Sequence, residues 1–286
     1  MNKNIKKILI TGSSGTIGTG LFKALLKKGY EVFGFDILPN IWDKDIDRHT
    51  IRGDIISSEN IKKIPHWIDL VIHLAAYPRV YASVLNPGLA FKNTAMTHRI
   101  LELVKAQKNP RFIFSSSREV YGNQGKNIYK EEDAVASGES PYSSSKILSE
   151  KEISACRKLY GLNYIIFRFS NVYGKYDQSD RLFPTMINKL KQDEPVIIFG
   201  KEKLLDFTYI DDCIDGIVLG IEKFHLAKNN IYNISSGESH KLLDVVNRLK
   251  KKLKSTSLVH INQNRPGEVI IYRADISKAK KILGYK

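Results

Sequence analysis

Short runs of apolar residues alternate with longer amphipathic segments as far as Arg168 in this 286-residue chain. Apolar runs bounded by polar residues and glycines are typical of buried strands, and apolar residues repeated every three or four positions are typical of helices. The predicted strands are Lys7–Thr11, Glu31–Asp36, Thr50–Asp54, Leu70–Leu74, Arg111–Ser115 and Asn163–Arg168. The predicted helices lie near Gly18–Lys28, Pro87–Gln107 and Pro141–Tyr160. This order predicts an α/β fold with a Rossmann-type, doubly wound parallel sheet that has helices on both faces.

The alternation ends after Arg168, because Pro184, Pro195 and Pro266 separate shorter elements. Ile231–Ile234 has the apolar pattern of one strand that returns to the main sheet. We therefore predict two parts that pack as one body. Residues 1–170, with the returning strand near 231–235, form the first domain, and residues 171–286 mainly form a smaller, discontinuous α/β lobe.

Composition narrows the classes of protein. The chain has no apolar run of about 18 residues and no basic-then-apolar leader, so a cytoplasmic protein that does not enter a membrane is expected. Its formal net charge is +15, but the lysines are scattered and do not alternate with aromatic residues along one stripe, which argues against nucleic-acid binding. Cys156 and Cys213 are the only cysteines, and their isolation predicts a reducing compartment and neither a disulfide nor a metal site.

A glycine-rich turn between the first predicted strand and the first predicted helix is a candidate dinucleotide site. Gly12, Gly15 and Gly18 have no side chains, so the backbone N–H groups can approach a pyrophosphate at the helix N-terminus. Asp36 ends the second predicted strand, where a carboxylate accepts hydrogen bonds from the adenosine ribose hydroxyls and repels a 2′-phosphate. The expected cofactor is therefore NAD rather than NADP.

Further cofactor contacts are expected in the glycine turn and after the third and fourth strands. These residues are Ser14, Thr16, Ile17, Asp54, Ile55, Leu74, Ala75 and Ala76. Asp54 is either an adenine-binding residue or an ordinary turn aspartate. His73 precedes the small residues that let the backbone approach the cofactor, and we interpret it as a packed core histidine rather than a catalytic base.

Tyr142 and Lys146 carry the candidate chemistry. Their i, i+4 spacing places both side chains on one face of the predicted helix, a turn apart. A buried ammonium and the positive nicotinamide ring both favour phenolate over phenol, so we expect a lowered tyrosine pKa and proton transfer with a sugar hydroxyl. Ser117, at the end of the fifth strand, either orients the same hydroxyl or serves the strand-end turn. Glu119 is either an acid or base acting one carbon away or a partner for Arg118.

The ordered series of motifs resembles the extended short-chain dehydrogenase/reductase family, in its NAD-dependent nucleotide-sugar epimerase/dehydratase branch. The motifs are Gly12-x-x-Gly15-x-x-Gly18, Asp36, His73-Leu74-Ala75-Ala76, Asn93, Ser117 with Val120-Tyr121-Gly122, Tyr142-x-x-x-Lys146, Arg168 to Gly174, Asp206-Phe207 with Asp211-Asp212, and Arg265-Pro266-Gly267-Glu268.

The resemblance implies roles for these residues and a partner for the chain. Ser117, Tyr142 and Lys146 would be catalytic; Tyr142 and Lys146 would also contact NAD, together with Asn93 and Ser115. Asn171 and Arg265 would bind the diphosphate region of a nucleotide-sugar substrate, and the planar donors of an arginine suit a diphosphate. The smaller lobe would then be the substrate-binding lobe. A homodimer is implied, through the helices near 87–107 and 141–160.

Two departures from the family pattern bear on the reaction. Leu205 stands where many relatives have an arginine, and Lys203 is a possible substitute. Relatives that dehydrate dTDP-glucose have the sequence Thr-Asp-Glu where this chain has Ser117-Arg118-Glu119. The aspartate of that pattern, their usual acid, is therefore replaced by Arg118 here. We therefore predict a 4-epimerase acting through a transient 4-keto sugar. A 4,6-dehydratase or decarboxylase that uses Glu119 is the alternative, and a non-catalytic NAD-binding regulator is disfavoured because Tyr142 and Lys146 are both present.

Overall fold

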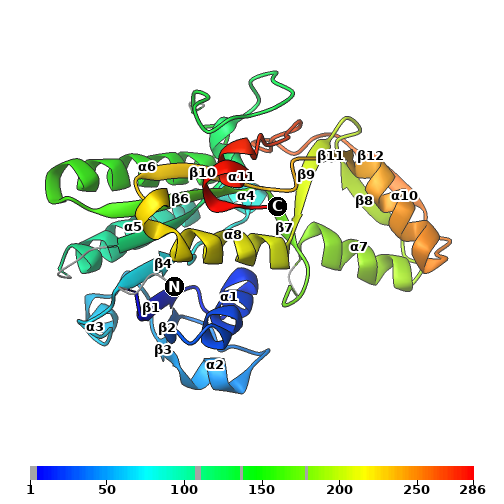
Figure 1. Cartoon of the computed structure of the whole chain (residues 1–286). Coiled ribbons are helices and arrows are strands. Elements are labelled where there is room, and N and C mark those ends of the chain that lie inside the picture. The colour runs from blue at the N-terminus through cyan, green and yellow to red at the C-terminus, as the bar shows by residue number, and fades with distance from the viewer. Residues whose placement is uncertain (1–4, 107–110, 136–137, 178–179) are drawn as a thin grey trace.

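A parallel sheet forms the centre of the computed structural model, which describes residues 5–106, 111–135, 138–177 and 180–286. Within these residues seven strands pair in the order β10-β6-β5-β4-β1-β2-β3, all in parallel (Figure 1). Their bounds are β1 Lys7–Thr11, β2 Glu31–Asp36, β3 Thr50–Arg52, β4 Leu70–His73, β5 Arg111–Ser117, β6 Asn163–Phe169 and β10 Asn230–Ile234. The order reverses between β1 and β4, which confirms the doubly wound fold predicted from the sequence.

Helices cover both faces of this sheet because the strands are apolar on both sides. In β1, Ile8 and Ile10 pack into one buried cluster and Leu9 packs into another. The first cluster includes side chains of α1 (Thr16–Lys27), α8 (Ile210–Glu222) and α11 (Ser277–Leu283), and the second includes those of α5 (Gly88–Lys105) and α6 (Pro141–Tyr160). The short elements around them are α2 Lys44–Arg48, α3 Ser58–Ile61, α4 Val80–Leu85, η1 Arg118–Tyr121 and α9 Phe224–Ala227.

A smaller lobe has its own buried cluster. Met186 and Leu190 of α7, Val196 and Ile198 of β8, Leu205 and Phe207 of β9, and Leu242 and Val246 of α10 form it. The lobe contains a three-stranded sheet in the order β11-β9-β7 and the parallel pair β12-β8, and Figure 1 shows α7 and α10 at its outer side. The bounds are β7 Asn171–Tyr173, α7 Leu182–Lys191, β8 Val196–Phe199, β9 Leu204–Tyr209, β11 Ser239–Lys241, α10 Leu242–Leu253 and β12 Val259–Asn262.

Asp206 joins this lobe to the end of β10. Its fully buried carboxylate accepts hydrogen bonds from the Ser236 hydroxyl at 2.7 Å and from the backbone N–H groups of Ser236 at 3.1 Å and Gly237 at 3.1 Å. A fourth bond comes from the N–H of Ala274 at 3.3 Å. Several donors to one buried carboxylate offset the cost of burying its charge, so this contact holds three chain segments together.

The N-terminus of α6 is closed by side-chain caps that fix the start of the helix. The Ser140 hydroxyl accepts from the N–H of Ser143, the Ser143 hydroxyl accepts from the N–H of Ser140, and Pro141 occupies the first turn. The helix ends at Gly161, whose φ of 70° is in the left-handed region that favours glycine. These two ends reproduce the predicted helix Pro141–Tyr160.

Most predicted bounds agree with the structure to within two residues. The third strand ends at Arg52 rather than Asp54, and the strand expected at Ile231–Ile234 is β10, beside β6. Gln107, the last residue of one predicted helix, lies outside the described residues. The division of the chain near residue 170 stays a prediction. No helix among the described residues is long and apolar enough to cross a membrane.

Candidate active site

The glycine turn lies between β1 and α1, at the carboxyl ends of the sheet strands. Gly12 has a φ of +74°, and its N–H donates to the carbonyl of Phe35 at 2.8 Å. A side chain at Gly12 would place its Cβ 2.7 Å from the backbone nitrogen of Ala75, and one at Gly18 would collide with the carbonyl oxygen of Gly12. Glycine is therefore required at both positions. Gly15, Thr16 and Ile17 complete the turn and begin α1.

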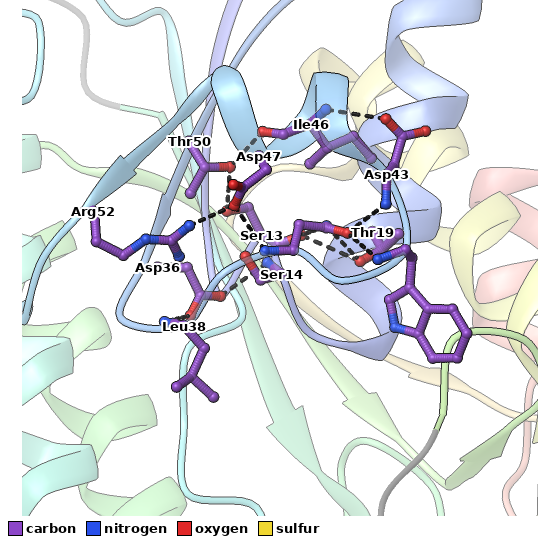
Figure 2. A network of polar contacts seen from close by, with 12 residues as sticks. Ser13, Ser14, Thr19, Asp36, Leu38, Asp43, Ile46, Asp47, Thr50 and Arg52 are labelled. Atoms are coloured by element: carbon purple, nitrogen blue, oxygen red, sulfur yellow. Dashed lines mark hydrogen bonds and ion pairs between the residues drawn. The ribbon is translucent and has the colours of Figure 1, made fainter.

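Asp36 is directed at the same turn from the end of β2. Its carboxylate accepts from the N–H of Ser14 at 2.9 Å and from that of Leu38 at 2.9 Å (Figure 2). Burial raises the pKa of this carboxyl, while the two N–H donors and the charge of Arg52 oppose that rise. Ser14 also has a buried hydroxyl that lacks a hydrogen-bond partner among the described residues. An orphaned donor, open backbone N–H groups and a carboxylate together fit the adenosine and diphosphate of a dinucleotide.

The loops after β3 and β4 border this turn. Ile55 is buried, and Asp54 accepts from the N–H of Ile56 at 2.9 Å as an ordinary turn aspartate does. After β4, Leu74 donates its N–H to the carbonyl of Thr11 at 3.1 Å, and Ala75 contacts Gly12. The structure thus places the Leu74-Ala75-Ala76 backbone beside the glycine turn.

Two buried side chains fix the end of β4 and the loop after it: Asn93 bonds to the loop, and His73 bonds to the neighbouring elements of β4. The buried Asn93 amide of α5 accepts from the N–H of Tyr77 at 2.7 Å and donates to its carbonyl at 3.2 Å. His73 lies between the hydroxyls of Thr11, at 2.7 Å, and Thr97, at 3.3 Å. Burial lowers the pKa of His73 to about 3, so the ring is neutral, in agreement with its interpretation as a core residue.

Ser117, Tyr142 and Lys146 come together where β5 meets α6. The Lys146 ammonium donates to the carbonyl of Ser115 at 2.7 Å, and the Ser117 side chain is close enough to the Tyr142 phenol to lower its pKa. Both Tyr142 and Lys146 are buried, with 7% and 4% of their surface exposed. The end of β5 and the start of α6, which are separated by more than 20 residues in the sequence, therefore lie side by side.

In the protein alone, burial dominates the pKa of Tyr142, so the lowering expected from Lys146 together with the nicotinamide ring stays a prediction. Burial raises the pKa of Tyr142 to about 12, although the nearby Ser117 side chain opposes the rise. Burial also lowers the pKa of Lys146 to about 8, because the ammonium loses its water. Desolvation is thus the largest cause of the pKa shift of both groups.

Glu119 lies beside this site in a buried ion pair. Its carboxylate contacts the Arg118 guanidinium at 2.8 Å, and Arg118 also donates to the Asn171 side chain at 3.3 Å. Burial raises the pKa of Glu119, and Arg118 opposes that rise. The second carboxylate oxygen of Glu119 has no hydrogen-bond partner among the described residues. Both interpretations of Glu119, partner of Arg118 and acid or base, are therefore compatible with the geometry.

Of the four predicted substrate residues, Ser117, Asn171, Lys203 and Arg265, the two cationic side chains already have partners. Lys203 forms a mostly buried ion pair with Glu268. The Arg265 guanidinium lies over the rings of Phe199 at 3.8 Å and Tyr81 at 4.9 Å. These distances are typical of cation–π contacts, which hold a guanidinium in place without neutralising it.

The segment that carries Arg265 reaches the catalytic helix. A side chain at Gly267 would approach Ser140, the cap of α6, to 3.0 Å, and its φ of +80° favours glycine. Asn171 of β7 donates to the carbonyl of Asp206 at 3.1 Å and accepts from Arg118. The smaller lobe thus brings Asn171 and the Arg265 segment to the edge of the Tyr142 site.

Comparison with known proteins identifies the family. The sequence model of the NAD dependent epimerase/dehydratase family matches residues 8–235. The chain belongs to this family. An uncharacterised UDP-glucose epimerase of Bacillus subtilis (strain 168) is 32% identical over 295 residues, which cover 98% of this chain and 92% of the relative. Family membership confirms NAD as the cofactor expected from the sequence.

Solved structures of this family superpose over nearly the whole chain. The UDP-glucuronic acid 4-epimerase of Bacillus cereus, in complex with UDP-glucuronic acid and NAD, has a TM-score of 0.89 and 33% identity. The UDP-glucose 4-epimerase of Thermotoga maritima, with UDP-glucose, has a TM-score of 0.89 and 28% identity. Each match covers 98% of this chain and 93% of the other.

Sequence reasoning did not find every residue at this candidate site. Tyr81 and Phe199 hold Arg265, but each lies in an ordinary short helix or strand, and no local pattern distinguishes it. The bond from Arg118 to Asn171 joins residues 53 positions apart. Only an alignment or a structure reveals pairs of this kind.

Proposed function

We propose that this chain is a nucleotide-sugar 4-epimerase, with a UDP-sugar as the favoured substrate class. The observation that carries the proposal is the group formed by the buried Tyr142 and Lys146 with the partly buried Ser117, at the carboxyl end of β5. The arginine at position 118 supports epimerisation over water loss, because it occupies one oxygen of Glu119. The two solved 4-epimerases named above, crystallised with UDP-sugars, support the substrate class.

Tyr142, Ser117 and Lys146 would have different roles in the proton transfer. Bound NAD would accept a hydride from C4 of the sugar and return it to the opposite face. Tyr142 would take the proton of the C4 hydroxyl and give it back, and Ser117, close to the Tyr142 phenol, would orient that hydroxyl. Lys146, held by the carbonyl of Ser115, would favour the phenolate form of Tyr142 during the transfer.

The substrate would lie between the two lobes. We assign the diphosphate to Asn171 and Arg265, with Lys203 secondary because its charge is already paired with Glu268. Arg265 carries a guanidinium that is stacked on two rings, so its donors have a fixed plane for a diphosphate. Cofactor contacts are assigned to the glycine turn, Asp36, and the residues after β3 and β4 named above.

Substituting Tyr142 with Phe tests the mechanism. We expect a loss of about 10²–10⁴-fold in turnover, the usual contribution of a general acid–base group, with NAD binding retained. Turnover of UDP-glucose and UDP-glucuronate would be followed by NMR of the epimeric products, and NAD binding by calorimetry. Tyr30→Phe is the matched control, because Tyr30 is also buried and its hydroxyl has no partner among the described residues. Near-normal turnover of the Tyr142 variant would refute the mechanism, and a wild type that binds NAD but converts no sugar nucleotide would favour the regulator.

Substituting Arg265 with Met tests the substrate placement. We expect weaker binding of UDP and of the UDP-sugar, by roughly 2–5 kcal/mol if the ion pair is desolvated, because an uncompensated phosphate charge remains. Calorimetric titration measures this, and NAD affinity should not change. Arg248→Met, at an exposed position of α10 in the same lobe, is the control. Unchanged UDP binding in the Arg265 variant would contradict the assignment.

A lyase is the second candidate function, and one observation favours it. Glu119 keeps one buried carboxylate oxygen without a partner among the described residues, and burial raises its pKa. A carboxylate of that kind is suited to take the proton from C5 of a 4-keto sugar, as a 4,6-dehydratase requires. A decarboxylase would likewise form a 4-keto sugar before it loses carbon dioxide.

Substituting Glu119 with Gln separates the two reactions. An epimerase should keep substantial activity in this variant, and the wild type in D₂O should incorporate no deuterium at C5, because no base removes that proton. Mass spectrometry and NMR of the products measure both, and also detect loss of water or carbon dioxide. Glu268→Gln removes a charge from the same cluster and is the control. Deuterium at C5 that disappears with Glu119→Gln, and only there, would establish the lyase.

We also propose that the chain forms a homodimer through α5 and α6. Phe91 and Leu148 are 77% and 54% exposed, and they border one shallow apolar surface across these two helices. Burying two large apolar side chains in each protomer would favour pairing of two such faces.

Charged substitutions on α5 and α6 test the dimer. Phe91→Glu combined with Leu148→Glu should give a monomer in light scattering, since each charge would be buried at the interface. Leu226→Glu is the control, because Leu226 is 61% exposed and lies on α9, away from these helices. A wild type that is monomeric at all concentrations would disprove the proposal.

A further inference from the structure

An arginine stands beside the acid that selects NAD. Asp36 and Arg52 are directly paired in the parallel register of β2 and β3. The Arg52 guanidinium donates to the carboxylate of Asp47, in α2, at 2.5 Å, and its other terminal nitrogen has no hydrogen-bond partner among the described residues. Figure 2 shows Arg52 between the carboxylates of Asp36 and Asp47. The ribose end of the cofactor site therefore contains two carboxylates and one guanidinium.

The Asp47–Arg52 pair is partly exposed, with 39% and 38% of the two side chains accessible, and it is part of a larger hydrogen-bond network. Asp47 also accepts from the N–H of Asn40 at 2.8 Å. The buried Asn40 side chain donates to the Thr19 hydroxyl at 2.9 Å and to the carbonyl of Ser13 at 3.4 Å. Hydrogen bonds thus connect the glycine turn through Asn40 to Asp47, and Asp47 in turn binds the Arg52 guanidinium.

Arginine near the end of the second or third strand is the residue type that accommodates the 2′-phosphate of NADP, because its planar donors bind phosphate bidentately. Here Asp47 occupies one of the two terminal nitrogens and cancels the charge. Asp36 adds a further negative charge, so the local sum over Asp36, Asp47 and Arg52 is negative. A phosphate at this place would meet repulsion from two carboxylates and attraction from one engaged guanidinium.

We propose that Asp47 is a second determinant of cofactor choice: it holds Arg52 away from a phosphate on the adenosine 2′-oxygen, and Arg52 binds such a phosphate once Asp36 and Asp47 are both neutral. Asp47 and Arg52 are specificity-determining residues that act beside Asp36. Removal of Asp36 alone then leaves Arg52 neutralised by Asp47. The preference for NAD should therefore relax only in part in that variant.

The test is calorimetric titration of NAD and NADP into nucleotide-free protein, for the wild type and five variants. The measured quantity is the ratio of the two affinities, in buffers of low and high salt. Asp36→Asn should shift the ratio toward NADP by about tenfold, and Asp36→Asn with Asp47→Asn by about a further tenfold. Asp47→Asn alone should shift it less, because Asp36 still repels the phosphate. The additional gain of the double variant should diminish at high salt, as a phosphate–guanidinium contact requires.

Two controls separate this role from a structural one. Arg52→Met in the double-variant background should remove the additional gain, since no guanidinium remains. Asp36→Asn with Asp45→Asn is the matched control: Asp45 lies in the same helix and pairs with Arg48 at 3.0 Å, and this pair is exposed. It should behave like Asp36→Asn alone.

Three results would overturn the proposal. The first is a double variant whose NADP-to-NAD ratio equals that of Asp36→Asn. The second is a gain that survives Arg52→Met, and the third is an equal gain with Asp45→Asn. A purely structural role for Asp47 would weaken both dinucleotides alike and leave the ratio unchanged, so that outcome also contradicts it.

Discussion

The close approach of Gly12 to Ala75 is the contact around which the site is arranged. It occurs at the carboxyl ends of β1 and β4, where the strand order reverses, and it requires a glycine because a Cβ would lie 2.7 Å from the Ala75 nitrogen. The flanking strands then place the functional groups on either side. Asp36 ends β2 on one flank, and Ser117 ends β5 on the other. One backbone contact thus aligns the glycine turn with the candidate catalytic side chains, which are far apart in the sequence.

Buried charges fix α6, the helix that carries Tyr142 and Lys146, against these strands. Glu150 of α6 receives two bonds from Arg168 of β6, at 3.0 and 2.7 Å, and one from the Ser116 hydroxyl of β5 at 2.5 Å. Lys146 lies one turn earlier on the same helix and donates to the neighbouring Ser115 carbonyl. A buried ion pair contributes little net stability because both groups lose their water, but its geometry is exacting. Here it sets the position of Tyr142 and Lys146 relative to β5.

The parts of the molecule that the sequence predicted are those governed by local pattern. β1 and β2 agree with the predicted ranges because their apolar runs are bounded by charged residues and glycine, and α6 agrees because Ser140, Pro141 and Gly161 mark its ends. The pairing of Tyr142 with Lys146 follows from helical spacing alone. Burial does not, so the raised pKa of Tyr142 could not be read from the spacing. The Lys203–Glu268 and Arg265–Phe199 contacts each join positions at least 65 residues apart, and no local pattern reports them.

Desolvation affects one carboxyl at the glycine turn and another beside the Tyr142 site, with different results. The pKa of the partly buried Asp36 and that of the buried Glu119 are both raised by desolvation, and an arginine opposes the rise at each. Asp36 accepts two backbone N–H bonds, so it is an acceptor prepared for ribose hydroxyls. Glu119 has Arg118 on one oxygen and no partner among the described residues on the other. A ligand beside this free oxygen would therefore change the pKa of Glu119. The carboxylate at the glycine turn is thus oriented by backbone groups of the fold, whereas the carboxylate beside Tyr142 is held by a side chain, that of Arg118.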